Sequence, residues 1–162
     1  MEHQAEQYGN KEWKRELPGN PFMEHNFVRP AGASDGKAVC VLTARPESLN
    51  VYGYIHGGAI YTLADNAAGY AAHTDGRAYV TQNGNLYFVG NQRGGTLTAT
   101  AQVRHRGRQT CLTDVAITGE NGKLIATGSF EYFCVRQTVQ EPPENVPVPP
   151  PETVPPENIP EP

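Results

Sequence analysis

Residues 50–72 read NVYGYIHGGAIYTLADNAAGYAA, and this segment decides the fold because it is both apolar and rich in small residues. Three glycines near its start indicate a loop, and residues 59–72 then predict one helix of about four turns at 3.6 residues per turn. Asp65 is the only formally charged side chain in the segment. A lone carboxylate in such surroundings is either an acid at a solvated edge of the helix or a functional group.

Small side chains cover much of this helix. They are Ala64, Ala67, Ala68, Gly69, Ala71 and Ala72. Because they occupy little volume, a curved sheet can approach the helix backbone closely. Glycine inside a helix costs about 1 kcal/mol relative to alanine, so Gly69 indicates a close contact rather than helix propensity. We therefore expect the helix to be enclosed by a sheet.

After the helix, the apolar pattern changes to a period of two, which is typical of strands. Strands are expected over residues 78–89, 96–103 and 111–117, and a last one over 123–135. Asn83-Gly84 predicts a bulge or bend in the first of them, and Asn121-Gly122 predicts the hairpin that leads into the last.

Before the helix, Asp35-Gly36 predicts a turn that leads into a strand over residues 37–44. Residues 20–30 are expected to form a short helix or a lid, and residues 2–17 another short helix. The fold class expected from these elements is α+β. One long central helix is wrapped by a curved antiparallel sheet of five to six strands, arranged as a meander.

The chain divides into three parts by composition. Residues 1–19 form a polar N-terminal segment, residues 20–138 the folded domain, and residues 139–162 a tail rich in proline and glutamate. Ten of the 14 prolines lie in residues 141–162. Because proline at this density blocks both helix and sheet, we expect the tail to be disordered or semi-rigid.

Charge and cysteine content restrict the function classes. Without the five glutamates of the tail, 13 basic residues face 12 acidic ones, so the folded part is close to neutral and lacks the basic face of a nucleic-acid-binding protein. The three cysteines form no CxxC pair, which favours a reducing compartment. No segment has the length of a membrane span or the apolar core of a signal peptide. We expect a soluble, cytoplasmic protein.

The start of the helix is suited to polarising a carbonyl group. The amides of Gly57 and Gly58 are expected to face forward unpaired, at the positive end of the helix dipole. Asp65 lies eight residues further on, about 12 Å along the axis. One chain therefore cannot easily bring its Gly57 amide and its own Asp65 to the same atom. A two-fold dimer with antiparallel helices could do so, which predicts two sites shared between subunits.

The motif in this segment resembles the hotdog-fold thioesterases, and in particular the phenylacetic-acid-degradation (PaaI-like) type. The residues that carry the resemblance are Asn50, Gly53, His56, Gly57, Gly58, Thr62, Leu63, Ala64, Asp65, Ala67, Gly69 and Ala71. The resemblance covers roughly residues 20–136 and extends to Val80-Thr81 and to the hairpin at Asn121-Gly122. A run of positions matched in type and spacing is quite specific.

The resemblance implies a role for each of five residues. Asp65 would be the general base or nucleophile on the thioester, and the Gly57 amide would hold the thioester oxygen. Asn50 would orient the water or the carboxylate, and His56 would position that loop or the substrate carbonyl. Thr81 lies where the family often has a serine or threonine that assists the attacking water. Asn50 and His56 could equally serve only to satisfy the loop backbone, and Thr81 could be an ordinary strand residue.

The resemblance also implies the ligand and the assembly. The substrate would be an acyl-CoA, with coenzyme A entering as part of the substrate and no separate cofactor, and the protein would be a homodimer or homotetramer. Arg106 and Arg108 lie where similar proteins contact the phosphates of coenzyme A, although a solvated turn explains them equally well. Residues 82–85 are polar where the family usually has apolar strand residues, so the identity of the acyl group is not carried over.

Other chemistries lack their motifs. No HxH or HExxH spacing supports a metal site and no GxxxxGK[ST] a phosphate loop, and Ser34, Ser48 and Ser129 lack the strand-to-helix turn of a serine hydrolase nucleophile. Hotdog dehydratases carry a different histidine loop. A non-catalytic protein that binds acyl-CoA or another small ligand stays open as the alternative, but such a protein has no use for the Asp65 carboxylate. A third possibility is a protein that only binds a partner, through its proline-rich tail. In that case, deleting residues 141–162 should abolish function.

Overall fold

The helix expected from the sequence is present as α2 (Gly57–Ala72) in the computed structural model, which describes residues 19–136. It begins two residues earlier than expected because His56 caps it. The His56 ring Nδ1 accepts a hydrogen bond of 2.9 Å from the Gly58 amide, so the first turn can include both glycines. No helix in the described residues is both long and apolar enough to cross a membrane.

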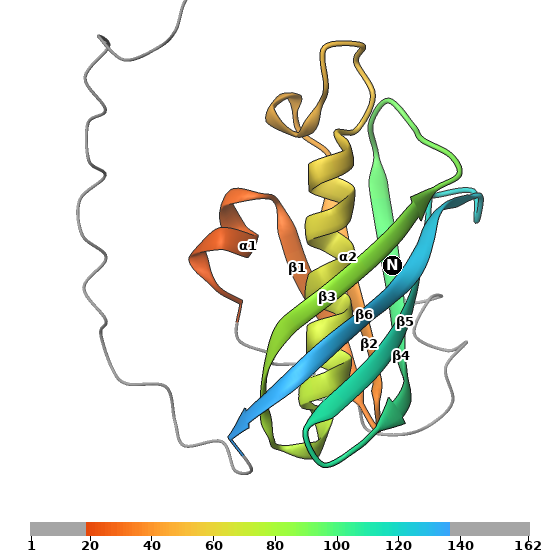
Figure 1. The fold of residues 1–162 in the computed structure, drawn as a ribbon. Coiled ribbons are helices and arrows are strands. Elements are labelled where there is room, and N and C mark those ends of the chain that lie inside the picture. Colours follow the sequence, from red (N-terminus) through yellow and green to blue (C-terminus); the bar gives the residue numbers. More distant parts are fainter. Residues whose placement is uncertain (1–18, 137–162) are drawn as a thin grey trace, which may run out of the picture.

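In the described part of the chain, six antiparallel strands form one sheet that curves round α2 (Figure 1). The strands are β1 (Val28–Ser34), β2 (Lys37–Thr43), β3 (Ala78–Phe88), β4 (Thr96–Arg106), β5 (Thr110–Thr118) and β6 (Leu124–Arg136). Their order is β1-β2-β4-β5-β6-β3. The expected α+β fold class is confirmed.

The predicted meander is wrong in where it places β3. A meander would pair β3 with β2, but β2 pairs instead with β4. β3 pairs with β6 at the far edge of the sheet. The reason is that α2 carries the chain across the concave face, so β3 starts on the opposite side of the helix from β2 (Figure 1). The bulge expected in β3 is present, because its register with β6 shifts between Thr81 and Asn83.

Residues 20–30 are not a lid. They form the short helix α1 (Pro21–His25), which is capped by the Asn20 side chain, and then the start of β1. Pro30 is tolerated in β1, although proline cannot donate a ladder hydrogen bond, because β1 is an edge strand and its register shifts just after Pro30. The short helix expected over residues 2–17 and the tail lie outside the described residues.

The core lies between α2 and the concave face of the sheet. The buried side chains of α2 are Ile60, Leu63, Ala64, Ala67, Ala68, Ala71 and Ala72. Opposite them, large side chains such as Leu97 and Phe130 are completely buried. A Cβ at Gly69 would lie 3.6 Å from the Tyr132 hydroxyl. The sheet therefore does approach the helix at Gly69, at ordinary contact distance.

All three cysteines are free and buried. Burial raises the pKa of the Cys40 thiol to about 12. A thiolate at this position would therefore be too scarce near neutral pH to act as a nucleophile.

Gly128 is expected to be the least replaceable glycine of the sheet. A Cβ there would collide with the Asn85 carbonyl oxygen of β3 and lie 2.9 Å from the Leu86 Cα. Backbone cannot rotate away as a side chain can, so Gly128→Ala should lower the free energy of unfolding by about 3 kcal/mol. For a chain of this size, that corresponds to a fall in Tm of roughly 10 °C.

Thermal unfolding followed by circular dichroism checks this expectation. Gly94→Ala is the matched control, because a Cβ at Gly94 meets nothing within 4 Å. Its Tm should stay within about 2 °C of the wild type, as for other neutral surface substitutions. Equal melting temperatures for Gly128→Ala and the wild type would show that β3 does not approach β6 this closely.

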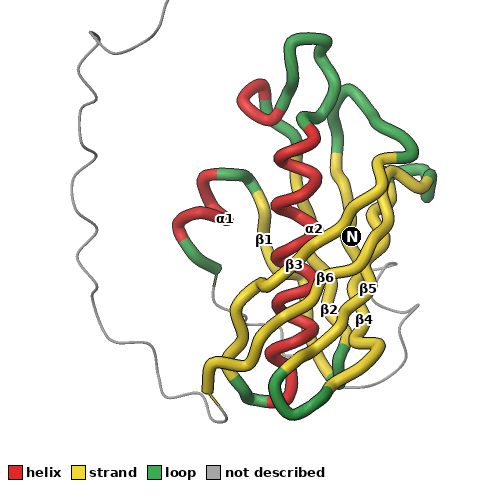
Figure 2. The backbone as a smooth tube through the Cα atoms, in the orientation of Figure 1, coloured by secondary structure: helices red, strands yellow, loops and turns green. Residues whose placement is uncertain are grey.

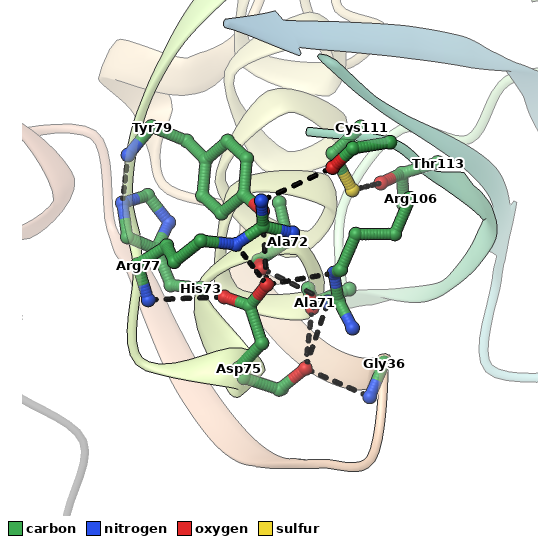
Figure 3. A network of polar contacts seen from close by, with 12 residues as sticks. Gly36, Ala71, Ala72, His73, Asp75, Arg77, Tyr79, Arg106, Cys111 and Thr113 are labelled. Carbon is green, nitrogen blue, oxygen red and sulfur yellow. Dashed lines mark hydrogen bonds and ion pairs between the residues drawn. The ribbon is translucent and has the colours of Figure 1, made fainter. Parts of the chain in front are cut away.

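A polar network closes the C-terminal end of α2, next to the short 3-10 helix His73–Asp75 (Figure 3). The Arg106 Nη2 lies 3.0 Å from the carbonyl oxygen of Ala72 and 3.2 Å from that of Ala71. The Arg106 Nε forms an ion pair of 3.1 Å with Asp75. A guanidinium placed on the last carbonyls of a helix satisfies acceptors that have no partner within the helix and complements the helix dipole.

The network holds Asp75 in its charged form. Burial alone would raise the pKa of this carboxyl group. The hydrogen bonds that Asp75 accepts from the backbone and side chain of Arg77 and from the Tyr79 hydroxyl outweigh burial, and with the charge of Arg106 they lower the pKa below 3.8. A carboxyl group with a lowered pKa in the folded state stabilises the fold above its unfolded-state pKa. That contribution is lost as the pH falls through the folded-state value.

Asp75→Asn should therefore remove part of the acid sensitivity of the fold. At pH 7 we expect the free energy of unfolding to fall by about 2 kcal/mol, the size of a charge-assisted hydrogen bond in a partly buried site. The difference from the wild type should shrink below about pH 4. Asp114→Asn is the control, because the carboxylate of Asp114 is 45% exposed and its ion pair with Arg104 should contribute little. Urea denaturation at pH 3, 4 and 7 measures all three proteins, and an Asp75→Asn deficit that does not change with pH would contradict the assignment.

Candidate active site

Asp65 lies halfway along α2 and is half-buried. One of its carboxylate oxygens, Oδ1, accepts two hydrogen bonds from the sheet. The Thr81 hydroxyl donates one of 2.9 Å, and the Tyr132 hydroxyl lies 3.0 Å away. The same Tyr132 hydroxyl lies 2.7 Å from the backbone carbonyl oxygen of Asp65. No residue within 19–136 donates to the other carboxylate oxygen, Oδ2.

The sheet register explains why two donors meet at one oxygen. Thr81 on β3 and Tyr132 on β6 are direct cross-strand partners, so their side chains lie side by side on the face that points toward α2. Tyr132 is 2% exposed, whereas Thr81 lies on the open edge strand and is exposed. Burial, and then the neighbouring Asp65 carboxylate, raise the pKa of Tyr132 well above its ordinary value, so this hydroxyl stays protonated and can donate.

The structure brings Thr81 and Asp65 into contact, and the role of Thr81 in assisting the water stays a prediction. Tyr132 did not stand out from the sequence. Tyrosine on the inner face of a strand is most often a core residue. Two features pointed weakly toward Tyr132. It alternates with Phe130 on the inner face of the last strand, and the helix carries Gly69 where the Tyr132 ring approaches.

His56 and Gly57 lie at the N-terminal end of α2. The Nδ1 of His56 is occupied by the Gly58 amide, and the side chain of His56 is exposed. His56 therefore caps the helix, as one of the two interpretations of the sequence held. None of the described residues accepts a hydrogen bond from the Gly57 amide. The Phe88 ring of β3 lies beside Gly57, 3.7 Å from where a Cβ would be.

Asn50 organises the loop that leads into α2. Its side-chain Oδ1 accepts hydrogen bonds of 2.9 Å from the Tyr52 amide and 3.2 Å from the Tyr54 amide. The loop is braced by Arg93, whose guanidinium stacks 4.3 Å from the centre of the Tyr54 ring. Figure 2 shows this loop and the one after β3 together at the end of the molecule where α2 begins. In one chain, Asn50 thus satisfies loop backbone and does not contact Asp65.

A pocket of about 580 Å³ opens beside the first two turns of α2. The helix contributes Gly58, Ala59 and Thr62 to its wall, and the turn after α1 contributes the segment 25–27. Thr62 lies three residues before Asp65, so the two side chains are neighbours on the helix surface. The pocket therefore lies at the start of the helix, and Asp65 itself is not part of its wall.

The two arginines expected to contact coenzyme A differ in their surroundings. Arg106 is turned inward onto the end of α2, where its guanidinium already has partners. Arg108 is exposed in the turn between β4 and β5. Their contact with phosphates stays a prediction. Among residues 19–136, no group of three or more His, Cys, Asp or Glu side chains could hold a metal ion.

One long helix wrapped by a curved antiparallel sheet, with a carboxylate halfway along the helix, defines a hotdog-fold protein. Solved structures agree. The PaaI protein of Escherichia coli, from its phenylacetic acid degradation operon, superposes with a TM-score of 0.70 and 31% identity, over 75% of this chain and 89% of that one. A hypothetical thioesterase from Streptococcus pneumoniae, solved with coenzyme A, gives a TM-score of 0.66 and 29% identity over 69% of this chain and 88% of that one.

The sequence comparisons identify the family. Residues 52–126 match the model of the thioesterase superfamily. The 1,4-dihydroxy-2-naphthoyl-CoA hydrolase of Listeria monocytogenes is 32% identical over 93 residues, which are 56% of this chain and 76% of that protein. The acyl-coenzyme A thioesterase PaaI of E. coli is 40% identical over 93 residues, 57% of this chain and 66% of that protein, just under two thirds of its length. The chain belongs to the thioesterase superfamily.

Proposed function

We propose that this protein hydrolyses an acyl- or aroyl-CoA thioester to the free acid and coenzyme A. The observation that carries the proposal is the Asp65 carboxylate, which is held at Oδ1 by two hydroxyl groups while none of the described residues bonds Oδ2. An oriented carboxylate with one available oxygen is what a general base or a nucleophile requires. Relatives named as an acyl-CoA thioesterase and a naphthoyl-CoA hydrolase support the substrate class.

The chemistry can follow two routes from this geometry. In the first, Asp65 takes a proton from a water molecule, which attacks the thioester carbonyl and expels the thiolate of coenzyme A. In the second, Asp65 itself attacks the thioester carbonyl and expels the thiolate of coenzyme A, which forms a mixed anhydride; water then opens the anhydride to the free acid and restores the carboxylate. In either route, Thr81 would assist the water. Variants of the S. pneumoniae thioesterase replace an aspartate and a threonine sixteen positions apart with alanine, which is the separation of Asp65 and Thr81 here.

We further propose that the active site is shared between two subunits. The Gly57 amide and Asp65 of one chain are separated by about 12 Å along α2, too far to act on one carbonyl. The edge strand β3 also carries large apolar side chains in an exposed position, with Val80 at 51%, Tyr87 at 62% and Phe88 at 51%. An apolar edge strand of this kind favours association with a second copy. Asp65 of the partner subunit would then face Gly57.

In this arrangement, the helix start holds the substrate. The Gly57 amide would polarise the thioester oxygen, and the pocket beside Gly58 and Thr62 would receive the adjoining part of the substrate. Arg106 and Arg108 would contact the coenzyme A phosphates, although the guanidinium of Arg106 would then have to share its contacts with the end of α2. Coenzyme A enters only as part of the substrate.

Thiol release from a panel of short, long and aromatic acyl-CoAs tests the proposal on the wild-type protein. Release from at least one of them above the background rate, with equal amounts of free acid and coenzyme A formed, is the expected result. No release from any thioester, combined with saturable binding of acyl-CoA in calorimetry, would favour the non-catalytic binding protein instead.

A further inference from the structure

We propose that Tyr132 is a positioning residue for the reaction, acting through Asp65. The inference rests on the proposed thioesterase function but adds a residue and a role to it. Tyr132 does not reach the available oxygen of the carboxylate. Its hydroxyl lies 3.0 Å from Asp65 Oδ1 and 2.7 Å from the Asp65 carbonyl oxygen, so it links the side chain and the backbone of the same residue to β6.

The two donors at Oδ1 are not equivalent. Thr81 is exposed and lies on the edge strand, where its hydroxyl can turn to water or substrate. Tyr132 is 2% exposed and lies on an interior strand that is paired on both sides, with β5 and with β3. The fixed donor is therefore Tyr132, and Thr81 is the donor that can exchange partners during a reaction.

The packing round the Tyr132 ring sets the position of its hydroxyl. A Cβ at Gly69 would lie 3.6 Å from the hydroxyl and 3.8 Å from the ring Cε1, so the ring lies close against the helix one turn after Asp65. A tyrosine has few rotatable bonds, and here the ring packs in the core. With Oδ1 fixed by this hydroxyl, Oδ2 is the carboxylate oxygen that none of the described residues bonds.

Positioning by a buried donor predicts a specific kinetic effect. Tyr132→Phe keeps the ring and removes only the hydroxyl, so the carboxylate keeps its charge but loses its fixed orientation. We expect kcat to fall about tenfold with KM changed less than twofold, because the substrate does not contact Tyr132. Combined with Thr81→Val, the loss should differ from the product of the two single losses, since both donors share one acceptor.

Tyr79→Phe is the matched control. Tyr79 is also a buried tyrosine, and its hydroxyl donates to a carboxylate, that of Asp75, at 2.9 Å. The Tyr79–Asp75 contact lies at the C-terminal end of α2, whereas Asp65 lies halfway along the helix. A merely structural role of Tyr132 would give both variants the same fall in Tm and the same small change in kcat. An unchanged kcat in Tyr132→Phe, or equal falls in both variants, would overturn the proposal.

Crystal structures separate this proposal from the proposed function. One rotamer of Asp65 in the wild type and more than one in Tyr132→Phe would support positioning, even if the wild type released no thiol from any substrate and the thioesterase function had failed. The same single rotamer in both would overturn it. Should Tyr132→Phe not fold, the wild-type crystal structure decides. A Tyr132 hydroxyl more than 3.5 Å from both the carbonyl oxygen and the Oδ1 of Asp65 would overturn the proposal, and contact with Oδ1 would support it.

Discussion

Asp65→Asn is expected to reduce thioester hydrolysis by a factor of about 100 or more, the size of a lost general base or larger. Asparagine has the shape of aspartate, and its carbonyl oxygen can still accept from Thr81 and Tyr132. The fold should therefore persist. A neutral amide cannot take a proton from water or attack a thioester, so the loss should appear in kcat, whichever of the two routes the reaction follows.

Thiol release under saturating substrate measures this effect, with Tm as the check on folding. Asp114→Asn is again the control, because Asp114 is a half-exposed carboxylate on β5 that accepts from Ser129 and lies outside the proposed site. It should keep the wild-type rate. Equal rates for Asp65→Asn and the wild type would exclude Asp65 as the catalytic group and leave the family fold with a different active site.

The segment 50–72 was enough to predict the fold, because so many small residues on one helix allow a sheet to close round it. Local patterns also predicted β2, β3, β4, β5 and β6. What they could not predict is which strands become neighbours. The position of β3 beside β6 depends on the path of α2 across the sheet, and no period in the sequence encodes that path.

The same limit applies to the site. Asp65 stood out because burying a charge among small apolar residues costs free energy, so a carboxylate at such a position indicates a function. Tyr132 did not, because its role depends on the β3–β6 register, which pairs it with Thr81. Arg106 shows the same limit. Its place in a basic turn left open both a phosphate contact and a solvated side chain, and only the path of the folded turn brings its guanidinium onto the carbonyls at the end of α2.

Gly57→Pro is expected to reduce kcat by a factor of about 100 to 1,000, which is the cost of losing one donor to a developing oxyanion. Proline has no N–H, and it is favoured at the first position of a helix, where that donor has no partner within the helix. His56 already has the extended backbone, with φ −62° and ψ 137°, that a residue before proline requires. The helix should therefore keep its start and lose only the amide. Gly57→Ala, which retains the amide and places a Cβ 3.7 Å from the Phe88 ring, should keep most of the activity.

Mixing the two inactive variants then tests whether the site is shared. In a dimer of one Asp65→Asn chain and one Gly57→Pro chain, one site receives the intact Gly57 amide from the first and the intact Asp65 from the second, while the other site lacks both. Random reassociation makes half of the dimers mixed, so about a quarter of the wild-type activity should return if each site uses both chains of a two-fold dimer. Activity that stays at the level of the separate variants, in a sample shown by mass spectrometry to contain mixed dimers, would mean that each chain carries its own complete site. The 12 Å between Gly57 and Asp65 would then have to be closed by a movement within one chain.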